Sequence, residues 1–87
     1  MFVILSYDIN EKRVNKISKT VRKYLWRVHR SVYNGHITER KLEAMKSELN
    51  RLIDPSEDSV FIYITQNENV FCVEQIGEIK ETEYITL

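Results

Sequence analysis

Cysteine, proline and glycine are scarce in this chain of 87 residues, which has one cysteine, one proline and two glycines. The single Cys72 has no second cysteine with which to form a disulfide or a zinc site, so we expect a reducing compartment, the cytoplasm. The few glycines and prolines exclude collagen-like and low-complexity chains. No run approaches the roughly 20 apolar residues of a membrane-spanning helix, and no basic residue precedes the apolar run near Met1. We therefore expect neither export nor membrane insertion.

Apolar residues make up 43% of the chain and charged residues 30%, which is typical of a globular protein. We find no repeat or linker, so residues 1–87 are predicted to form a single domain. Because so short a domain buries a modest fraction of its surface, we expect it to oligomerise.

The net charge of zero conceals an uneven distribution of charge along the chain. Residues 1–53 hold twelve Lys and Arg against five acids, a balance of +7, whereas residues 54–87 hold one Lys against eight acids, a balance of −7. Such an asymmetry can give a neutral molecule a basic surface for a polyanion such as nucleic acid, although two ordinary solvated faces would give the same count.

The first half of the chain predicts a strand followed by a helix. Residues 2–5 are a continuous apolar run that ends at Asp8, as in a central strand buried on both faces. Asn10 is expected to act as the N-cap of the helix. Its apolar positions recur at helical spacing and are Val14, Ile17, Val21 and Leu25.

The middle of the chain predicts strand and then a second helix. Residues 27–37 are rich in Val, Tyr and His, and we interpret them as one bent strand or two short ones, with a turn at Asn34-Gly35. Thr38 is the expected N-cap of the helix, which should end before Pro55. Its apolar stripe is Leu42, Met45, Leu49 and Leu52.

The last third predicts two strands, residues 59–65 and 70–76, joined by a polar loop. A further strand at 84–87 should add to a sheet edge, either that of its own chain or that of a partner. Together these elements predict an α+β fold, a ferredoxin-like βαββαβ sandwich with two helices on one face of an antiparallel sheet and an extra C-terminal strand.

The other face of that sheet is predicted to be apolar and uncovered within one chain. Two helices cannot bury all of the apolar side chains that the late strands carry, which are Phe61, Tyr63, Phe71 and Val73. We therefore expect the open face to pack against a second copy around a two-fold axis, giving a homodimer.

Three segments together resemble one family over nearly the whole chain. They are Val3-Ile4-Leu5-Ser6-Tyr7-Asp8-Ile9, Arg27-Val28-His29-Arg30-Ser31-Val32-Tyr33-Asn34-Gly35 and Asp58-Ser59-Val60-Phe61-Ile62-Tyr63. In order and spacing they are similar to the small CRISPR-associated core adaptation protein. The second segment departs from the pattern Arg-Val-Gln-x-Ser-Val-Phe-Glu at His29, Tyr33 and Asn34. The resemblance implies a ferredoxin-like homodimer that works with the larger CRISPR integrase in spacer acquisition, and a metal-dependent endonuclease acting on RNA or DNA.

Asp8 is the candidate catalytic and metal-binding residue. It stands where a buried strand ends, so in a two-fold dimer it can face its own copy and form a site with two carboxylates. Such oxygen ligands suit Mg²⁺ or another divalent cation, which could activate water and neutralise charge on the scissile phosphate. Alternatively, Asp8 only organises the turn that follows the strand.

A basic cluster is the candidate nucleic-acid-binding surface. Its eight cations fall within nineteen positions and are Lys12, Arg13, Lys16, Lys19, Arg22, Lys23, Arg27 and Arg30. Such a surface suits phosphate contacts that do not read bases. Ser31 is assigned to the same surface, and Tyr7 could lie beside it, where hydroxyls could donate hydrogen bonds to phosphate. The alternative for Tyr7 is packing in the core or at an edge.

The remaining chemistry-bearing residues give weaker signals. His29 could act as a general base near neutral pH, but a lone histidine on a strand is more often a surface or hydrogen-bonded residue, and His36 beside a turn is a weaker candidate. Tyr24 and Trp26 could stack on bases, but at a helix end we expect them in the core or at a dimer contact. Cys72 is interpreted as a small core residue.

The sequence thus favours a CRISPR spacer-acquisition protein, a nucleic-acid-binding scaffold with possible Mg²⁺-dependent endoribonuclease activity. Two other classes stay open, a toxin-like RNA interferase and a small-molecule-sensing ferredoxin-like regulatory domain. The clustered charge disfavours the sensing domain, which needs no basic helix.

Overall fold

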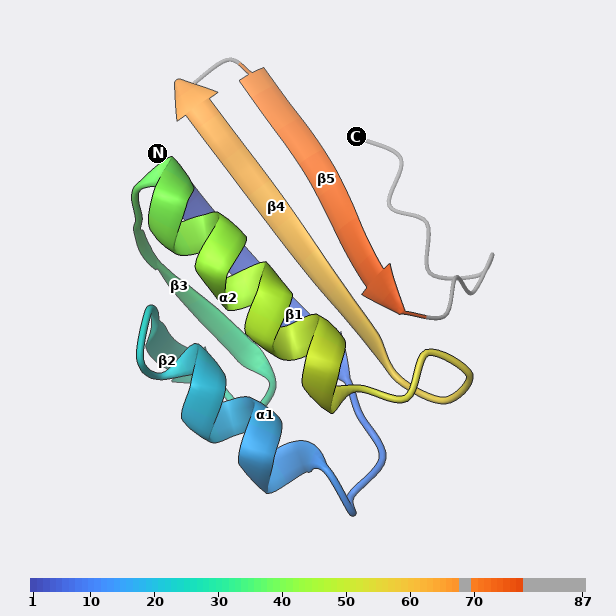
Figure 1. The fold of residues 1–87 in the computed structure, drawn as a ribbon. Helices are drawn as coiled ribbons and strands as arrows, with labels where there is room; N and C mark the ends of the chain where they lie inside the picture. The colour runs from blue at the N-terminus through green and yellow to red at the C-terminus, as the bar shows by residue number, and fades with distance from the viewer. Residues whose placement is uncertain (68–69, 78–87) are drawn as a thin grey trace.

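The computed structural model describes residues 1–67 and 70–77, which form five strands and two helices (Figure 1). In chain order these are β1 (Phe2–Asp8), α1 (Val14–Val21), β2 (Trp26–His29), β3 (Val32–His36), α2 (Glu39–Leu52), β4 (Ser59–Asn67) and β5 (Val70–Gly77). The strands lie in the order β2-β3-β1-β4-β5, and every neighbouring pair is antiparallel. The first four strands in this order have the ferredoxin-like arrangement, which confirms the predicted fold class. The predicted strand at 84–87 lies outside the described residues.

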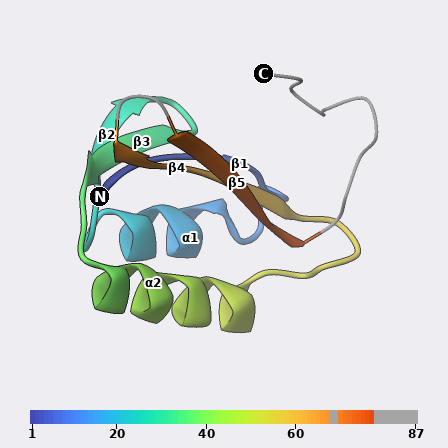
Figure 2. The ribbon, with the colours of Figure 1, turned by 90° about the horizontal axis from the view of Figure 1, so that it is seen from above.

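Both helices lie on one face of the sheet, and no described helix covers the other face (Figure 2). The side chains of β1 alternate accordingly, because successive residues of a strand point to opposite faces. Val3 and Leu5 are fully buried under the helices, whereas Phe2 and Ile4 are half-buried on the open face. The prediction of a first strand buried on both faces is therefore wrong for a single chain.

The core is built from the alternate residues of the central strands that face the helices. Leu5 pairs in register with Tyr33 on β3 and with Ile62 on β4, and all three side chains are fully buried. The neighbours of Ile62 along β4, Phe61 and Tyr63, point to the opposite face of the sheet. They are half-buried on the open face, as the sequence predicted. The side chains of Phe71, Cys72 and Val73, for which predictions were also made, lie outside those that the structure describes.

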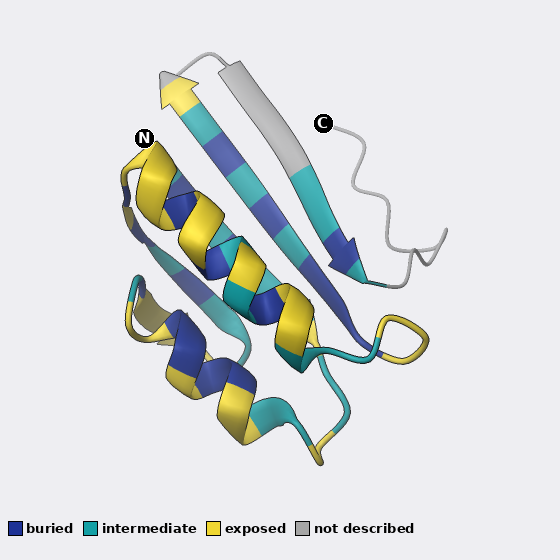
Figure 3. Cartoon of the chain, in the orientation of Figure 1, coloured by how far each residue is buried: buried dark blue, intermediate teal, exposed yellow. Residues whose placement is uncertain are grey.

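The second helix forms as predicted. Thr38 caps α2, its hydroxyl accepting a hydrogen bond from the backbone N–H of Lys41. Leu42, Met45 and Leu49 are buried on one side of the helix while the other side is exposed (Figure 3). Because this apolar stripe follows the helical period, it anchors α2 to the sheet.

The first helix begins later than predicted. Asn10 does not cap it, because the Asn10 side chain accepts from the N–H of Lys12 and makes a turn instead. The helix starts at Val14, with Arg13 at the N-cap position and no side-chain cap. It also ends at Val21, so Leu25 reaches the core from the segment that follows the helix.

The strand material at 27–37 forms two short strands, one of the two arrangements that the sequence allowed. Their turn lies at Arg30-Ser31 and not at Asn34-Gly35, which is part of β3. The glycine serves packing: a Cβ at Gly35 would lie 3.3 Å from the Leu25 side chain. A residue that usually marks a turn thus lets a strand approach a core side chain closely.

Candidate nucleic-acid interface

Asp8, the candidate metal ligand, is exposed at the end of β1, opposite Ser59 on β4. It follows Tyr7, and because neighbouring residues of a strand face opposite ways, Asp8 belongs to the open face and Tyr7 to the helix face. The end of β1 therefore presents different groups on its two sides.

The fit of Asp8 to a divalent cation can be tested against its surroundings. No group of three or more His, Cys, Asp or Glu able to hold a metal forms among the residues the structure describes. Mg²⁺ is nevertheless bound in many proteins by one or two carboxylates together with waters and a substrate phosphate. An exposed carboxylate on the face expected to meet a second copy fits this mode, with Asp8 as the ligand from each chain.

The predicted basic cluster divides into separate groups in the structure. Arg13 forms an ion pair with the buried carboxylate of Asp58 at 2.6 Å and with Glu57 at 2.6 Å. Lys23 pairs with Glu48 on α2. These two cations are held by carboxylates.

Three lysines of the cluster remain on the surface of the α1 region. Lys12, Lys16 and Lys19 are exposed, and none of them forms an ion pair with a described carboxylate. They therefore add uncompensated positive charge beside the end of β1, as contacts to nucleic-acid phosphates require.

The remaining predicted residues meet in a cleft of about 370 Å³ between α1 and the turn that joins β2 to β3. We call it the arginine cleft, and its lining residues are Tyr7, Val14, Asn15, Ser18, Arg22, Arg27, Arg30 and Ser31. Its described lining holds three guanidinium groups and no carboxylate. Tyr7 and Ser31 are also joined along the backbone, since the N–H of Tyr7 donates to the carbonyl of Ser31 at 3.2 Å.

A chain of hydroxyl groups forms the floor of the arginine cleft. Ser18 Oγ lies 2.8 Å from the buried Tyr33 hydroxyl, which lies 3.2 Å from the Tyr7 hydroxyl. Arg22 donates to the same Ser18 oxygen from Nε at 3.2 Å and from Nη2 at 3.1 Å. Burial, with the hydroxyl of Tyr33 beside it, raises the pKa of Tyr7 to about 12, so Tyr7 keeps its proton at neutral pH.

Sequence reasoning did not single out Ser18 or Tyr33 as parts of this site. A signal was present in Tyr33, which stands where the resemblance has Phe and so adds a hydroxyl to a core position. A buried hydroxyl needs hydrogen-bond partners, and a serine four residues before an arginine on the neighbouring helix can supply one. The contact itself depends on the packing of α1 against the sheet, which the sequence does not specify.

The other candidates lie apart from the arginine cleft. His29 is exposed and accepts a hydrogen bond at Nδ1 from the N–H of Arg30, so it helps to form the turn. His36 packs edge-on against Phe2, with ring centroids 5.2 Å apart. Tyr24 donates to Glu48 at the margin of the core. Trp26 is 81% exposed, so a core position is wrong for it, and the alternative of a dimer contact stays a prediction.

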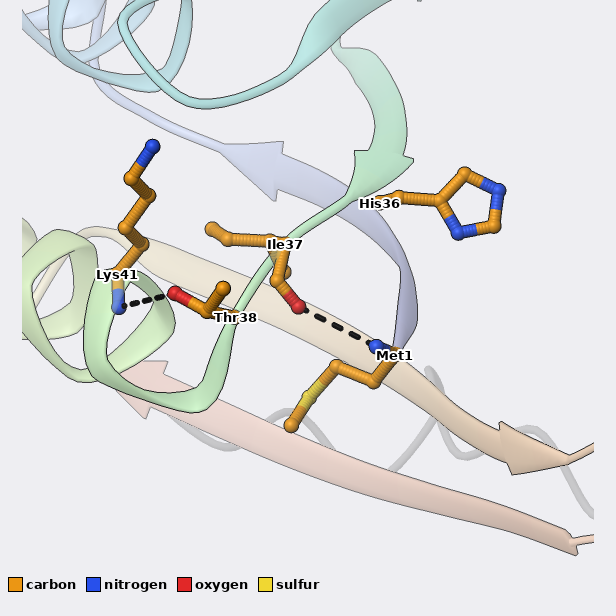
Figure 4. A pocket seen from close by; sticks show the side chains of 5 residues that line it. All are labelled: Met1, His36, Ile37, Thr38 and Lys41. Carbon is orange, nitrogen blue, oxygen red and sulfur yellow. Dashed lines mark hydrogen bonds between the residues drawn. The ribbon is translucent and has the colours of Figure 1, made fainter.

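A second cavity, of about 280 Å³, lies at the opposite end of β1, between that strand and the start of α2 (Figure 4). Two of its polar groups are paired within the chain: the Met1 ammonium donates to the carbonyl of Ile37 at 3.3 Å, and Thr38 Oγ1 caps α2. This end of the sheet collects none of the predicted site residues. The candidate interface is therefore the arginine cleft and the α1 surface next to it.

The family model described as CRISPR associated protein Cas2 matches residues 1–71. The chain belongs to this family. A Cas2 relative from Thermotoga maritima, named CRISPR-associated endoribonuclease Cas2, is 49% identical over 77 residues, which are 88% of each chain. A solved structure described as cas2 has 31% identity and a TM-score of 0.74, and it covers 100% of this chain and 98% of its own. Cas2 from Streptococcus pyogenes has 29% identity and a TM-score of 0.70, covering 79% of this chain and 89% of its own.

The match to Cas2 confirms the family that the three sequence segments resembled, and it favours a CRISPR-associated nuclease family over a sensing domain. The prediction of an endoribonuclease agrees with the names that the curated Cas2 relatives carry. In the part of the chain described here, no helix is long and apolar enough to cross a membrane.

Proposed function

We propose that this Cas2-family chain acts in CRISPR spacer acquisition as a homodimeric scaffold that binds nucleic acid and joins the larger CRISPR integrase. We include in the proposal Mg²⁺-dependent endonuclease activity, of the endoribonuclease class, at Asp8, and a cytoplasmic location. The observation that carries it is the gathering of unpaired cations at one end of β1, in a chain of a CRISPR-associated family.

The binding role is supported by the charge that the fold leaves uncompensated. Arg22, Arg27 and Arg30 line the arginine cleft, and the exposed lysines of the α1 region extend the same surface. None of these cations forms an ion pair with a described carboxylate. A surface of this kind binds phosphates of any sequence and releases counterions on binding.

The homodimer is supported by the open face of the sheet. Ile4, Phe61 and Tyr63 lie side by side there on paired strands, half-exposed in the single chain. A contiguous apolar face is a common dimer interface, and an isologous contact would repeat every feature of one chain on the other. The two copies of Asp8 would then both lie on the faces that the two chains turn toward each other.

The cutting role is supported by the position of Asp8 and by the names of the curated relatives. A divalent cation bound there would supply a Lewis acid and a bound water of lowered pKa. The protein's own contribution would be to hold the nucleic-acid backbone against the end of β1 through the arginine cleft.

The proposal is tested by incubating the full chain with single-stranded RNA and with duplex DNA, each in Mg²⁺ or in EDTA. We expect Mg²⁺-dependent cleavage that is lost in Asp8→Asn and kept in Glu11→Gln, a control that removes a neighbouring exposed carboxylate. A gel shift of equal strength in all three proteins would show that binding is intact. Cleavage that persists in Asp8→Asn or in EDTA would contradict the metal site, and the absence of any shift would contradict the binding role.

A further inference from the structure

The arginine cleft is lined by hydrogen-bond donors whose partners are incomplete. Arg27 and Arg30 are exposed, and the described side-chain bond of Arg27 is a long one, from Nε to the carbonyl of His29 at 3.4 Å. Arg22 is bonded only to a neutral oxygen, that of Ser18. Three guanidinium groups thus converge on one cleft with no described carboxylate to neutralise them.

A chain of hydroxyl groups lies beneath them. Arg22 donates two hydrogen bonds to Ser18 Oγ. Ser18 Oγ lies 2.8 Å from the Tyr33 hydroxyl, which lies 3.2 Å from the Tyr7 hydroxyl, and in each pair either oxygen can donate.

Tyr7 is part of the lining of the arginine cleft, so the hydroxyl chain ends at a group that a ligand in the cleft can reach. The cleft therefore offers a hydroxyl in addition to the three guanidinium groups. Charged hydrogen-bond donors that approach from several directions, with no carboxylate in the described lining, suit a tetrahedral oxyanion such as phosphate.

We propose that the arginine cleft is a binding site for a single phosphoryl group, either a terminal phosphate of a nucleic acid or one phosphate of its backbone. Arg22, Arg27 and Arg30 donate to its oxygens, Tyr7 donates from the floor, and Ser18 is a positioning residue that orients Arg22 and the hydroxyl chain. The inference rests on the proposed binding of nucleic acid and adds the group that is held and the place where it is held.

The position of the cleft separates the bound phosphate from the chemistry proposed at Asp8. Tyr7 and Asp8 are consecutive, but Tyr7 faces the helices and Asp8 faces the open side of the sheet. A phosphate held in the arginine cleft is therefore a different phosphate from any that Asp8 would meet. By holding this phosphate, the cleft fixes the position of the nucleic-acid strand. Asp8 is not needed for phosphate binding in the cleft.

The test is a titration of the ¹⁵N-labelled full chain with inorganic phosphate, compared with chloride at equal ionic strength. We expect saturable shifts of the signals from Tyr7, Arg22, Arg27 and Arg30. Affinity should fall about tenfold or more in Arg27→Gln, because each charge-assisted hydrogen bond is strong. It should be unchanged in Lys41→Gln, which removes an exposed cation at the opposite end of the sheet.

A second variant tests the role of Ser18. Ser18→Ala should weaken phosphate binding and move the Arg22 signals, while Ser18→Thr, which keeps the hydroxyl, should restore binding. Circular dichroism checks that both variants fold. Equal phosphate affinity in Ser18→Ala and the unmodified chain would overturn the positioning role.

The source of the phosphate is found with short oligonucleotides that carry or lack a 5′-phosphate. A preference for the phosphorylated strand that disappears in Arg27→Gln would assign the terminal group, and equal binding of both strands, reduced in Arg27→Gln, would assign a backbone phosphate. No saturable shift with inorganic phosphate, or the same loss in Lys41→Gln as in Arg27→Gln, would overturn the proposal. Duplex binding without phosphate binding would contradict this inference alone, and phosphate binding without any binding of nucleic acid would contradict the proposed function.

Discussion

Arg13 holds the buried carboxylate of Asp58 through two hydrogen bonds, from Nε to Oδ2 at 2.6 Å and from Nη2 to Oδ1 at 3.1 Å. The same carboxylate accepts from the backbone N–H groups of Asn10 and Asp54, each at 2.9 Å. Four donor groups from three residues thus meet on one side chain. This contact ties the loop after β1 to the loop before β4 and so fixes the end of β1, where Asp8 and the arginine cleft lie.

Replacing the carboxylate of Asp58 should destabilise the fold strongly. Asp58→Ala leaves Arg13 and two backbone N–H groups without their acceptor, and we expect a loss of about 3 kcal/mol in the free energy of unfolding. Urea denaturation measures it. Glu57→Gln is the matched control, because Glu57 pairs with the same arginine but its side chain is 50% exposed, so its loss should cost less than about 1 kcal/mol. Equal losses in the two variants would contradict the central role of Asp58.

The same carboxylate should make stability depend on pH in the acid range. The hydrogen bonds from Arg13 lower the pKa of Asp58 to about 2, below the value of roughly 3.9 expected in the unfolded chain. A lowered folded-state pKa gives stability that is present above pH 4 and is lost as the pH falls toward 2. The loss should reach about 2.6 kcal/mol only once the pH is below both pKa values, near pH 1, and Asp58→Asn should remove this part of the pH dependence. A stability profile that is the same in both proteins between pH 4 and 2 would show another group to be responsible.

Gly77, at the end of β5, should tolerate no side chain. Its φ is +104°, a conformation that favours glycine, and a Cβ there would lie 2.1 Å from the carbonyl oxygen of Asp58. Because that neighbour is backbone, Gly77→Ala must move β4 or β5, and we expect a loss of about 2 kcal/mol or more. Gly35→Ala, where the nearest atom is the end of a flexible side chain at 3.3 Å, should cost less. Thermal unfolding of both variants ranks them, and the reverse order would contradict the packing described here.

The open face should hold two copies together. Light scattering at micromolar concentration should report about twice the chain mass of 10.4 kDa. Tyr63→Glu places a charge on the half-buried open face and should give monomers, whereas Lys41→Glu, on an exposed position of α2, should leave the mass unchanged. A monomeric parent chain would remove the two-carboxylate arrangement of Asp8.

The parts of the fold that repeat regularly in the sequence could be predicted from it. The alternation around Leu5 and Ile62 and the stripe on α2 follow periods of 2 and 3.6, so they identify strands and a helix. Local turn and cap signals predicted the structure less reliably, because two of these residues serve tertiary contacts. Asn10 lies in a turn that is held by Asp58, and Gly35 lies against the side chain of Leu25. Neither role can be deduced from neighbouring residues in the sequence.

The candidate site was predictable as a charge pattern but not as a structure. The basic residues were identified by type, yet Arg13 turned inward to Asp58 while Arg22, Arg27 and Arg30 gathered around the cleft. Their separation depends on where α1 begins and on how the β2–β3 turn folds back toward it. Those are long-range contacts that composition and spacing do not encode.

The most direct test of the nucleic-acid role is the salt dependence of duplex DNA binding by the unmodified chain, Lys16→Glu and Lys41→Glu. We expect the affinity to fall steeply with salt in the unmodified chain. Charge reversal at Lys16, beside the arginine cleft, should weaken binding of every sequence and reduce the slope of log K against log salt by about 1 or more. Lys41→Glu, at the opposite end of the sheet, should change neither. Binding that is insensitive to salt, or equal losses in the two variants, would contradict a nucleic-acid surface at this end of the molecule.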